Sequence, residues 1–359
     1  MKIAQLAPNI YPIPPAGYGG TELVVGNITE GLVAGGNDVT LFASGDSKTK
    51  AKLYKTAPKS LANTPGFKMR DFKKYLAEVA QQFIKVQNQF EIVHIHIEDS
   101  AARFADEIKI PSIYTHHGIF SPEVKEVYNR NINLLRFTAL SKSQMRLMPN
   151  LNYFGVVYHG LEISKYRFSP KGDEPLYFIG KIDPVKGTDV AVKVAQKLKK
   201  NLNITGNISS SHTSYFTEKI EPYLTPKIRY HGVVDFGTKI DFFDNSKVTL
   251  FPIDWEEAFG LVMIESMACG TPVVAFRRGS VPEVIVDGET GFIVEPGNVG
   301  AMVEAVKRIY DMPEGEYKEM RKRCREHVEK NFIVERMVEG YEKVYQNVIK
   351  DWTNRRKSS

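Results

Sequence analysis

Short apolar runs of strand length alternate along this chain with amphipathic stretches of helix length. One series of such runs occupies residues 2–7, 38–43, 92–97, 112–115 and 136–140. A second series begins after residue 170, at 176–179, 202–205, 228–230, 248–251, 273–276 and 292–294. Strands that alternate with helices form parallel sheets with crossover helices. The two series therefore predict two doubly wound α/β domains.

The joint between the two series is the polar segment ISKYRFSPKGD, residues 163–173, which contains Pro170 and Gly172. We place the first domain at residues 1–165 and the second at 166–335. From Val334 onward, apolar residues recur at helical spacing and predict an amphipathic helix. We expect the polar tail beyond Asp351 to fray.

Composition limits the partners and the compartment. The 359 residues carry 48 Lys and Arg against 42 Asp and Glu, and the net charge of +6 favours an acidic partner such as phosphate, nucleic acid or an anionic membrane. Two cysteines, Cys269 and Cys324, allow neither a disulfide framework nor a four-cysteine zinc site. We recognise no secretory signal and no apolar stretch of about 18 residues. These features predict a cytoplasmic protein, with peripheral contact at the inner membrane face as an option.

A glycine-rich loop, PNIYPIPPAGYGG, follows the first expected strand. In doubly wound sheets such a loop lets a helix N-terminus present backbone N–H groups to an anion. Gly17, Gly19 and Gly20 suit this role, although their spacing differs from the dinucleotide fingerprint and no P-loop lysine follows them. The alternative is that they are ordinary turn glycines.

Two lysines, Lys181 and Lys186, lie in IGKIDPVKGTD, where the first strand of the second domain runs into a helix. Two ammonium groups at this place could bind a diphosphate and stabilise the charge that develops on it as a leaving group. The alternative is that both are solvated surface lysines.

The segment WEEAFGLVMIESMACGTPVVAF contains Glu257 and Glu265, eight residues apart. Its apolar stretch predicts a buried helix, on which residues eight apart share nearly one face. One carboxylate could then meet the hydroxyls of a sugar and the other those of a ribose. Gly260 frees the backbone at the helix start, so the N–H groups of Phe259, Gly260 and Leu261 could face a ligand. The alternative is a helix cap by Glu257 and an internal salt bridge by Glu265.

Two histidines, His116 and His117, end the strand in PSIYTHHGIF, which is a suitable place for catalysis or substrate positioning. Adjacent strand residues point to opposite faces, so at most one of the two should enter a cleft. His94 and His96 have the two-residue spacing of a metal-ligand pair, but their apolar strand favours a core role. The chain also lacks an Asp-x-Asp pair for a divalent ion, so we expect no metal site.

In this order, these motifs resemble the retaining glycosyltransferases of family 4, which have the GT-B fold of two facing Rossmann-like domains. The resemblance covers nearly the whole chain, from GYGGTE through THHG, GKIDPVKG and EAFGLVMIESMACGTPVVA to PEVIVDGETGFIV. It implies that residues 1–165 form the acceptor-side domain and residues 166–335 the domain that binds the nucleotide-sugar donor. It also implies that a C-terminal helix, residues 336–359, crosses back to the first domain.

The resemblance assigns a role to each matching position. The catalytic residues would be His117, Glu257 and Lys186, with His116 as the second choice of histidine. His117 would lie beside the donor sugar, Glu257 would contact the sugar hydroxyls, and Glu265 would bind the nucleotide ribose. The groups implied in diphosphate binding are Gly19, Gly20, Lys181, Lys186 and the amides of Phe259, Gly260 and Leu261. The base would lie near Gly232, Val233 and Val234.

The implied reaction is transfer of a hexose-type sugar from a nucleotide-diphosphate sugar to an acceptor hydroxyl, with retention and without a metal or other cofactor. Lys181 stands where the family usually has arginine, so its contact would be a point charge. We find no clear carboxylate nucleophile on the acceptor side of His117, which favours front-face displacement. The acceptor could be a glycan, a glycolipid or a small molecule, and the base could be that of UDP, GDP or ADP.

Two other functions fit the same motifs less well: a nucleotide-sugar epimerase, and a binding module that retains the fold without the chemistry. Nucleic acid is not an expected partner, and the sequence leaves the oligomeric state open. Residues 67–90 form a basic amphipathic segment that could contact an anionic membrane or a lipid-linked acceptor. Its basic and apolar residues are Lys68, Arg70, Lys73 and Lys74, with Phe67, Met69, Phe72, Leu76 and Phe83. The alternative is an ordinary surface helix packed on the first domain.

Overall fold

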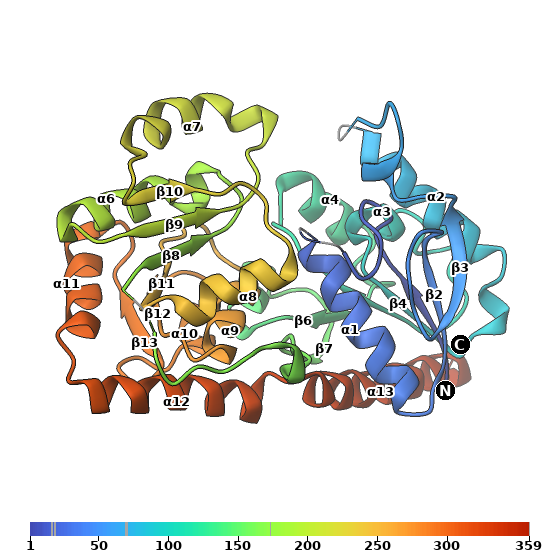
Figure 1. Ribbon diagram of the computed structural model, residues 1–359. Helices are drawn as coiled ribbons and strands as arrows, with labels where there is room; N and C mark the ends of the chain where they lie inside the picture. Colours follow the sequence, from blue (N-terminus) through green and yellow to red (C-terminus); the bar gives the residue numbers. More distant parts are fainter. Residues whose placement is uncertain (16, 18, 69–70, 173, 359) are drawn as a thin grey trace. The chain divides into compact units, whose positions relative to one another are not determined.

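The computed structural model describes residues 1–15, 17, 19–68, 71–172 and 174–358. The chain divides into two compact units (Figure 1). The first unit comprises Met1–Gly160 and Val334–Ser359, and the second comprises Leu161–Ile333. The sequence prediction placed these divisions at residues 165 and 335. Because the C-terminal segment belongs to the first unit, that unit is built from two separate stretches of chain.

The first unit contains a parallel sheet and its covering helices. Its strands are β1 (Lys2–Leu6), β2 (Asp38–Ser44), β3 (Lys52–Ala57), β4 (Ile92–Ile95), β5 (Ser112–Thr115), β6 (Phe137–Ala139) and β7 (Tyr153–Val156). Its helices are α1 (Gly20–Ala34), α2 (Phe72–Ile84), α3 (Glu98–Ala102), α4 (Pro122–Arg130), α5 (Lys142–Leu147) and α13 (Val334–Ser358).

The strand order in this sheet is β3-β2-β1-β4-β5-β6-β7, and neighbouring strands pair in parallel. The side chains of β2 alternate between two layers: Phe42 packs in the cluster formed with α2, α3 and α4, whereas Leu41 and Ala43 pack beside Val25 of α1. The chain order reverses between β1 and β4. Ligands of doubly wound sheets bind at such a reversal, outside the carboxyl ends of the strands.

The two edge strands of this sheet, β3 and β7, were absent from the sequence prediction. Their side chains are exposed or only partly buried along their whole length. A strand that lies at an edge needs no continuous apolar run, so the criterion that finds the inner strands does not apply to it.

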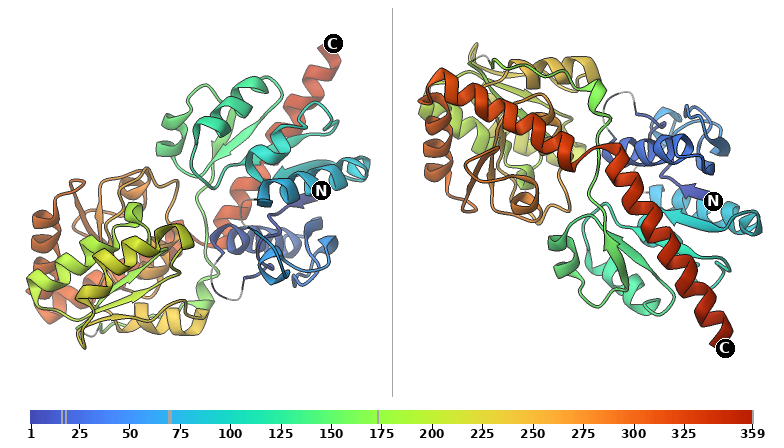
Figure 2. Two further views of the ribbon diagram at one scale, coloured as in Figure 1. Left: turned by 90° about the horizontal axis from the view of Figure 1, so that it is seen from above. Right: turned by 90° about the horizontal axis from the view of Figure 1, so that it is seen from below.

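Helix α13 runs along the first unit, as the red ribbon in both views of Figure 2 shows. Its side chains at helical spacing, including Met337, Tyr341 and Tyr345, are buried as the sequence predicts. The expectation that the chain frays beyond Asp351 is wrong, because the helix continues to Ser358. Arg136 contacts this end of the helix twice: its Nε lies 2.8 Å from Asp351 Oδ2, and its guanidinium carbon lies 5.3 Å from the ring centroid of Trp352.

Helix α2 occupies part of the basic segment 67–90. Leu76 and Phe83 are buried in the core of the first unit, and the Nζ of Lys73 lies 3.0 Å from Glu123 Oε2. These contacts match the ordinary surface helix, and membrane contact stays a prediction. Met69 and Arg70 of the same segment lie outside the described residues. No helix in the described part of the chain is long and apolar enough to cross a membrane.

The second unit has the same kind of architecture, so the prediction of two doubly wound α/β domains is confirmed. Its strands are β8 (Leu176–Ile179), β9 (Leu202–Thr205), β10 (Ile228–Tyr230), β11 (Val248–Phe251), β12 (Val273–Phe276) and β13 (Gly291–Val294). Its helices are α6 (Thr188–Leu198), α7 (Thr213–Lys219), α8 (Phe236–Asn245), α9 (Leu261–Ala268), α10 (Val281–Val284), α11 (Val299–Tyr310) and α12 (Glu314–Asn331).

The strand order of the second sheet is β10-β9-β8-β11-β12-β13, again all parallel. Helices α6 and α11 contact each other over the strands, and α9 packs with α8 and α12. Here the chain order reverses between β8 and β11. The loops that follow these two strands are therefore the expected ligand loops of the unit.

Candidate active site

The reversal point of the second unit brings two of the predicted residues together. Lys186 ends a short 3₁₀ turn, Pro184–Lys186, after β8, and Glu257 lies in the loop after β11. The Nζ of Lys186 lies 2.9 Å from Glu257 Oε2, and the two side chains are 26% and 12% exposed. The same ammonium lies 4.4 Å from the ring centroid of Trp255. The lysine is thus a paired and oriented charge rather than a solvated surface group.

Helix α9 begins at Leu261, so Glu257 precedes the helix by four residues. The expectation that Glu257 and Glu265 share one helix face is therefore wrong. Gly260 caps the helix with φ 79°, and a Cβ at this position would lie 3.3 Å from Glu257 Cγ and 3.2 Å from Phe251 Cζ. Glycine thus permits both the left-handed turn and the close approach of Glu257 to the helix start. The amides of Phe259, Gly260 and Leu261 lie at this positively polarised helix end.

Glu265 is buried inside α9 and forms an internal ion pair. Its Oε1 accepts hydrogen bonds from Lys239 Nζ at 2.6 Å and from Tyr166 Oη at 3.0 Å. This is the arrangement that the alternative interpretation expects for Glu265, while the helix cap suggested for Glu257 is absent, since α9 has no side-chain cap. The two contacts compensate the buried charge and hold the carboxylate in place. Ribose binding by Glu265 stays a prediction.

The loops after β8, β9 and β10 meet through backbone contacts. Gly206, with φ 146°, lies so close to Gly180 that a Cβ would be 1.7 Å from the Gly180 oxygen, and its N–H donates to the Gly232 carbonyl at 2.8 Å. Lys181 follows Gly180, with its Nζ 4.0 Å from Asp183 Oδ2. Val233 is exposed. The residues predicted to hold a base, Gly232, Val233 and Val234, therefore lie at the same sheet edge as Lys181.

In the first unit, His117 is the end of a buried hydrogen-bonded chain. Its Nε2 lies 2.9 Å from Nδ1 of His96, whose Nε2 lies 2.9 Å from Gln5 Oε1. Gln5 Nε2 donates to Tyr345 Oη at 3.0 Å, and this hydroxyl lies 2.7 Å from Nδ1 of His94. These hydrogen bonds connect β1, β4 and α13 to His117, which lies two residues after the end of β5.

This chain determines the tautomer of His117. Gln5 Oε1 can only accept, so Nε2 of His96 donates to it and Nδ1 of His96 accepts from His117 Nε2–H. Nδ1 of His117 then carries the lone pair and can accept a hydrogen bond from a ligand hydroxyl. Burial and the neighbouring histidines hold the pKa of His96 and His117 well below the usual range, which keeps both imidazoles neutral.

The sequence predicts a core placement for His94 and His96, and both are buried. Their hydrogen bonds add a positioning role that the apolar strand pattern does not reveal.

His116 points away from this chain. Its ring stacks on Phe120 with centroids 4.4 Å apart, and its Nδ1 lies 3.1 Å from Tyr128 Oη. Burial lowers the pKa of His116 to about 4. The two adjacent histidines thus face opposite sides, as the sequence predicts, and His117 is the one that joins the hydrogen bonds to His96 and Gln5.

The sequence motifs do not single out two carboxyl groups of the first unit, those of Glu22 and Glu98. Glu22, in the first turn of α1, is buried, and burial raises its pKa to about 7. Its Oε2 would lie 3.2 Å from a Cβ on Gly19, the residue that caps α1 with φ 144°. Gly20 begins the helix. The carboxyl of Glu22 thus lies close to Gly19, and its position in GYGGTE is the sequence signal that could have identified it.

Glu98, which follows β4, is the second of these carboxyls. It has φ 49°, a left-handed conformation that is uncommon outside glycine. Burial raises the pKa of Glu98 to about 7, with a further contribution from Asp99. Its Oε1 would lie 2.6 Å from a Cβ on Gly118. A carboxyl therefore lies next to the backbone that carries His117.

Comparison with known proteins finds likenesses over both units. Residues 162–331 match the family Glycosyl transferases group 1, and residues 18–151 match Glycosyltransferase Family 4. A Klebsiella pneumoniae relative, described as an uncharacterized 41.2 kDa protein in the cps region, is 26% identical over 94% of this chain and 99% of its own.

Two solved structures share the fold at low identity. Sucrose-phosphate synthase from Thermosynechococcus elongatus has a TM-score of 0.81 and 18% identity, over 98% of this chain and 100% of that one. The Anabaena protein HepE in complex with UDP and glucose has a TM-score of 0.75 and 18% identity, over 96% and 99% of the two chains.

Proposed function

Because this chain belongs to the group 1 glycosyltransferases, with the GT-B fold, we propose that it moves a hexose-type sugar from a nucleotide-diphosphate sugar to an acceptor hydroxyl. The observation that carries the proposal is the Lys186–Glu257 pair at the reversal point of the second sheet, beside the N-terminus of α9. The complex of HepE with UDP and glucose supports a nucleotide-sugar donor.

In the proposed complex, Lys186 and Lys181 bind the diphosphate, and the amides at the start of α9 add partial positive charge. Glu257 accepts hydrogen bonds from the sugar hydroxyls while its other oxygen stays with Lys186. This arrangement places a cation where the leaving group gains negative charge, which is the step that needs most stabilisation. It requires no metal ion, so metal-independent transfer is part of the proposal.

We propose that His117, in the motif THHG, is the side chain that contacts the donor sugar. The lone pair on Nδ1 accepts a hydrogen bond from a sugar hydroxyl, and His96 holds the ring in that tautomer. A neutral imidazole adds no charge to the site. Its contribution is therefore orientation of the sugar rather than transfer of a proton.

The proposed displacement occurs on one face of the sugar. The bond between the anomeric carbon and the phosphate oxygen breaks, the bond to the acceptor oxygen forms on the same side, and the acceptor proton passes to the departing phosphate oxygen. Glu98 does not change this preference, because a carboxyl with a pKa of about 7 is half protonated near neutral pH and suits proton transfer better than nucleophilic attack.

The test is a thermal-shift panel of nucleotides and nucleotide sugars, followed by NMR of the product's anomeric configuration. We expect one nucleoside diphosphate to raise the melting temperature, since a ligand that binds only the native state stabilises it. Glu257→Ala and Lys186→Ala should abolish transfer. Transfer that survives in both variants would refute the proposal. An epimerase would alter the sugar without an acceptor, and a binding module would show nucleotide binding without turnover.

A further inference from the structure

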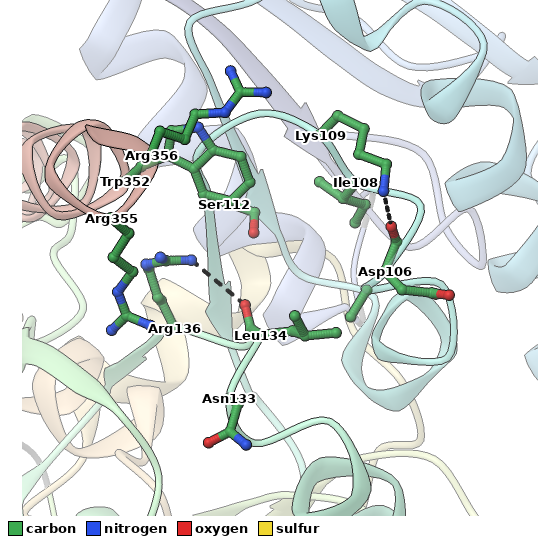
Figure 3. Close-up of a pocket in the computed structure, with 11 residues that line it drawn as sticks. Asp106, Ile108, Lys109, Ser112, Asn133, Leu134, Arg136, Trp352, Arg355 and Arg356 are labelled. Atoms are coloured by element: carbon green, nitrogen blue, oxygen red, sulfur yellow. Dashed lines mark hydrogen bonds between the residues drawn. The ribbon is translucent and has the colours of Figure 1, made fainter. Parts of the chain in front are cut away.

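A cavity of about 360 Å³ lies in the first unit at the amino ends of β5 and β6 (Figure 3). Ser112, the first residue of β5, lines it, and so does Arg136, which directly precedes β6. His117 follows the opposite, carboxyl end of β5. Strands of a parallel sheet all run the same way, so this cavity and His117 lie at opposite ends of the strands.

Three segments of the first unit form the walls. One wall is the turn before β5, which carries Lys109, and the second is the turn before β6, which carries Leu134 and Arg136. The end of α13 forms the third with Trp352 and two further arginines, Arg355 and Arg356. Figure 3 shows the three arginines and Trp352 on one side of the cavity and Lys109 on the other. The cavity therefore exists only because the C-terminal helix packs on this unit.

The lining is strongly cationic. Its charged groups are Lys109, Arg136, Arg355, Arg356 and a single carboxylate, that of Asp106. Figure 3 shows this carboxylate directed away from the arginines. Asp351, outside the lining, pairs with two of the arginines: its carboxylate lies 2.8 Å from Arg136 Nε and 3.0 Å from Arg355 Nε. The four cations outnumber the two carboxylates of Asp106 and Asp351, which leaves an excess of two positive charges.

Arg136 and Trp352 give this charge a fixed geometry. The Arg136 side chain is 4% exposed, and its guanidinium carbon lies 5.3 Å from the Trp352 ring centroid. The guanidinium carbon of Arg356 lies 5.7 Å from the same ring. An indole ring that contacts two guanidinium groups restricts both of them. Asp351 accepts from the Nε of Arg136 and the Leu134 carbonyl accepts from its Nη1, so Nη2 is the donor nitrogen that remains for a ligand.

We propose that this cavity binds a compact phosphate anion with two or more negative charges, such as inorganic phosphate, pyrophosphate or a small phosphate ester. Guanidinium groups present paired N–H donors that match phosphate oxygens, and the excess of two charges matches a dianion better than a single carboxylate. The volume is at the small end of ligand pockets. The site is separate from the donor loops of the second unit and independent of the proposed transfer reaction.

The chain offers a selective probe for this site, because its two tryptophans are Trp255, beside Lys186, and Trp352, in the cavity. In a Trp255→Phe background, Trp352 is the one remaining tryptophan. Titration with pyrophosphate and with inorganic phosphate should change its fluorescence in a saturable way. Calorimetry in the same background provides a second readout that does not depend on fluorescence.

Arg356→Gln and Lys109→Gln test the lining, and both change exposed side chains. Each should weaken binding about tenfold, the usual effect of losing one charge-assisted hydrogen bond. Lys350→Gln is the matched control, since Lys350 is an exposed lysine of α13 outside the lining. Binding that is unchanged in the two lining variants, or equally weakened in all three, overturns the proposal.

The phosphate could be free or part of a lipid headgroup, and sedimentation with vesicles separates these sources. Vesicles that contain phosphatidic acid are compared with vesicles of phosphatidylcholine alone. Arg356-dependent sedimentation with phosphatidic acid, without binding of free phosphate or pyrophosphate, assigns the site to a lipid phosphate. Binding of the free anions without sedimentation assigns it to a soluble ligand. Absence of Arg356-dependent binding to every probe refutes the site.

Discussion

The structural and chemical roles of Lys186 can be separated by the substitution Lys186→Met. Methionine retains most of the apolar stem against Trp255 but removes the charge that lies 2.9 Å from Glu257 Oε2. The Glu257 side chain is only 12% exposed, so in the variant a largely buried carboxylate loses its cation. We therefore expect two effects with different signatures, one on folding and one on ligand binding.

The effect on folding follows from the loss of the partner. A buried charged group without its hydrogen bond costs about 1–3 kcal/mol, so the free energy of unfolding should fall by that amount. Lys186→Met/Glu257→Gln removes both charges and should regain most of the loss, with a coupling energy of about 1–3 kcal/mol. The affinity for the nucleoside diphosphate should fall roughly 10- to 100-fold in both variants, because neither has the ammonium that we propose to bind the diphosphate.

Urea unfolding measures the first effect, and calorimetric titration with the nucleoside diphosphate measures the second. Lys193→Met is the control. Lys193 and Asp189 both lie on α6 and pair at 2.6 Å, but the Lys193 side chain is 55% exposed. It should cost less than about 0.5 kcal/mol and leave affinity unchanged. Wild-type affinity in Lys186→Met refutes the diphosphate role. A double variant no more stable than the single one refutes the argument about the buried pair.

Three further predictions concern other residues. His96→Phe removes the acceptor for His117 Nε2–H. It should lower the rate of transfer roughly 100-fold in a product assay and leave nucleotide affinity unchanged in calorimetry. An equal loss of affinity would contradict a positioning role for His96. The native pKa of Glu22 is about 7, above its unfolded value of about 4.3, so the native state loses stability as pH rises through this interval. Glu22→Gln should match the wild type at pH 4 and exceed it by roughly 3 kcal/mol at pH 8, and an equal difference at both pH values in urea unfolding would contradict this reasoning. Gly206→Ala places a Cβ 1.7 Å from a backbone oxygen and should lower the free energy of unfolding by more than about 3 kcal/mol. Gly288→Ala, with φ 81° and no atom within 4 Å of its Cβ, should lower it by about 1 kcal/mol. Equal urea midpoints for the two variants would refute the clash at Gly206.

The accuracy of the sequence prediction varies with burial. Strands such as β11 and β12, at 248–251 and 273–276, agree with their predicted bounds because every side chain in them is buried and the apolar run is continuous. The edge strands β3 and β7 have mixed, partly exposed side chains and carry no such signal. The end of α13 differs from prediction because a long-range partner, Arg136, stabilises a segment whose own composition is polar.

The site shows the same division between local and distant information. Lys186 and Glu257 lie in short motifs that identify them, and the structure brings them into contact. The helix-face argument for Glu257 and Glu265 fails because Gly260 begins the helix later than the apolar pattern suggests. The hydrogen bonds around His117 depend on the pairing of β1 with β4 and of β4 with β5, and on Tyr345 of α13. No local pattern in one sequence contains that information.

The division of the first unit into two stretches of chain also sets an order of assembly. A ribosome completes residues 1–160 early, but it makes α13 only after the whole of the second unit. Until then the surface that Tyr341 and Tyr345 pack against is uncovered, and Nδ1 of His94 lacks its hydrogen-bond partner, the Tyr345 hydroxyl. The second unit can fold as soon as it emerges, because it is continuous in sequence. The nascent polypeptide should therefore be able to bind nucleotide before the hydrogen bonds that link His117, His96, Gln5, Tyr345 and His94 in the first unit are complete.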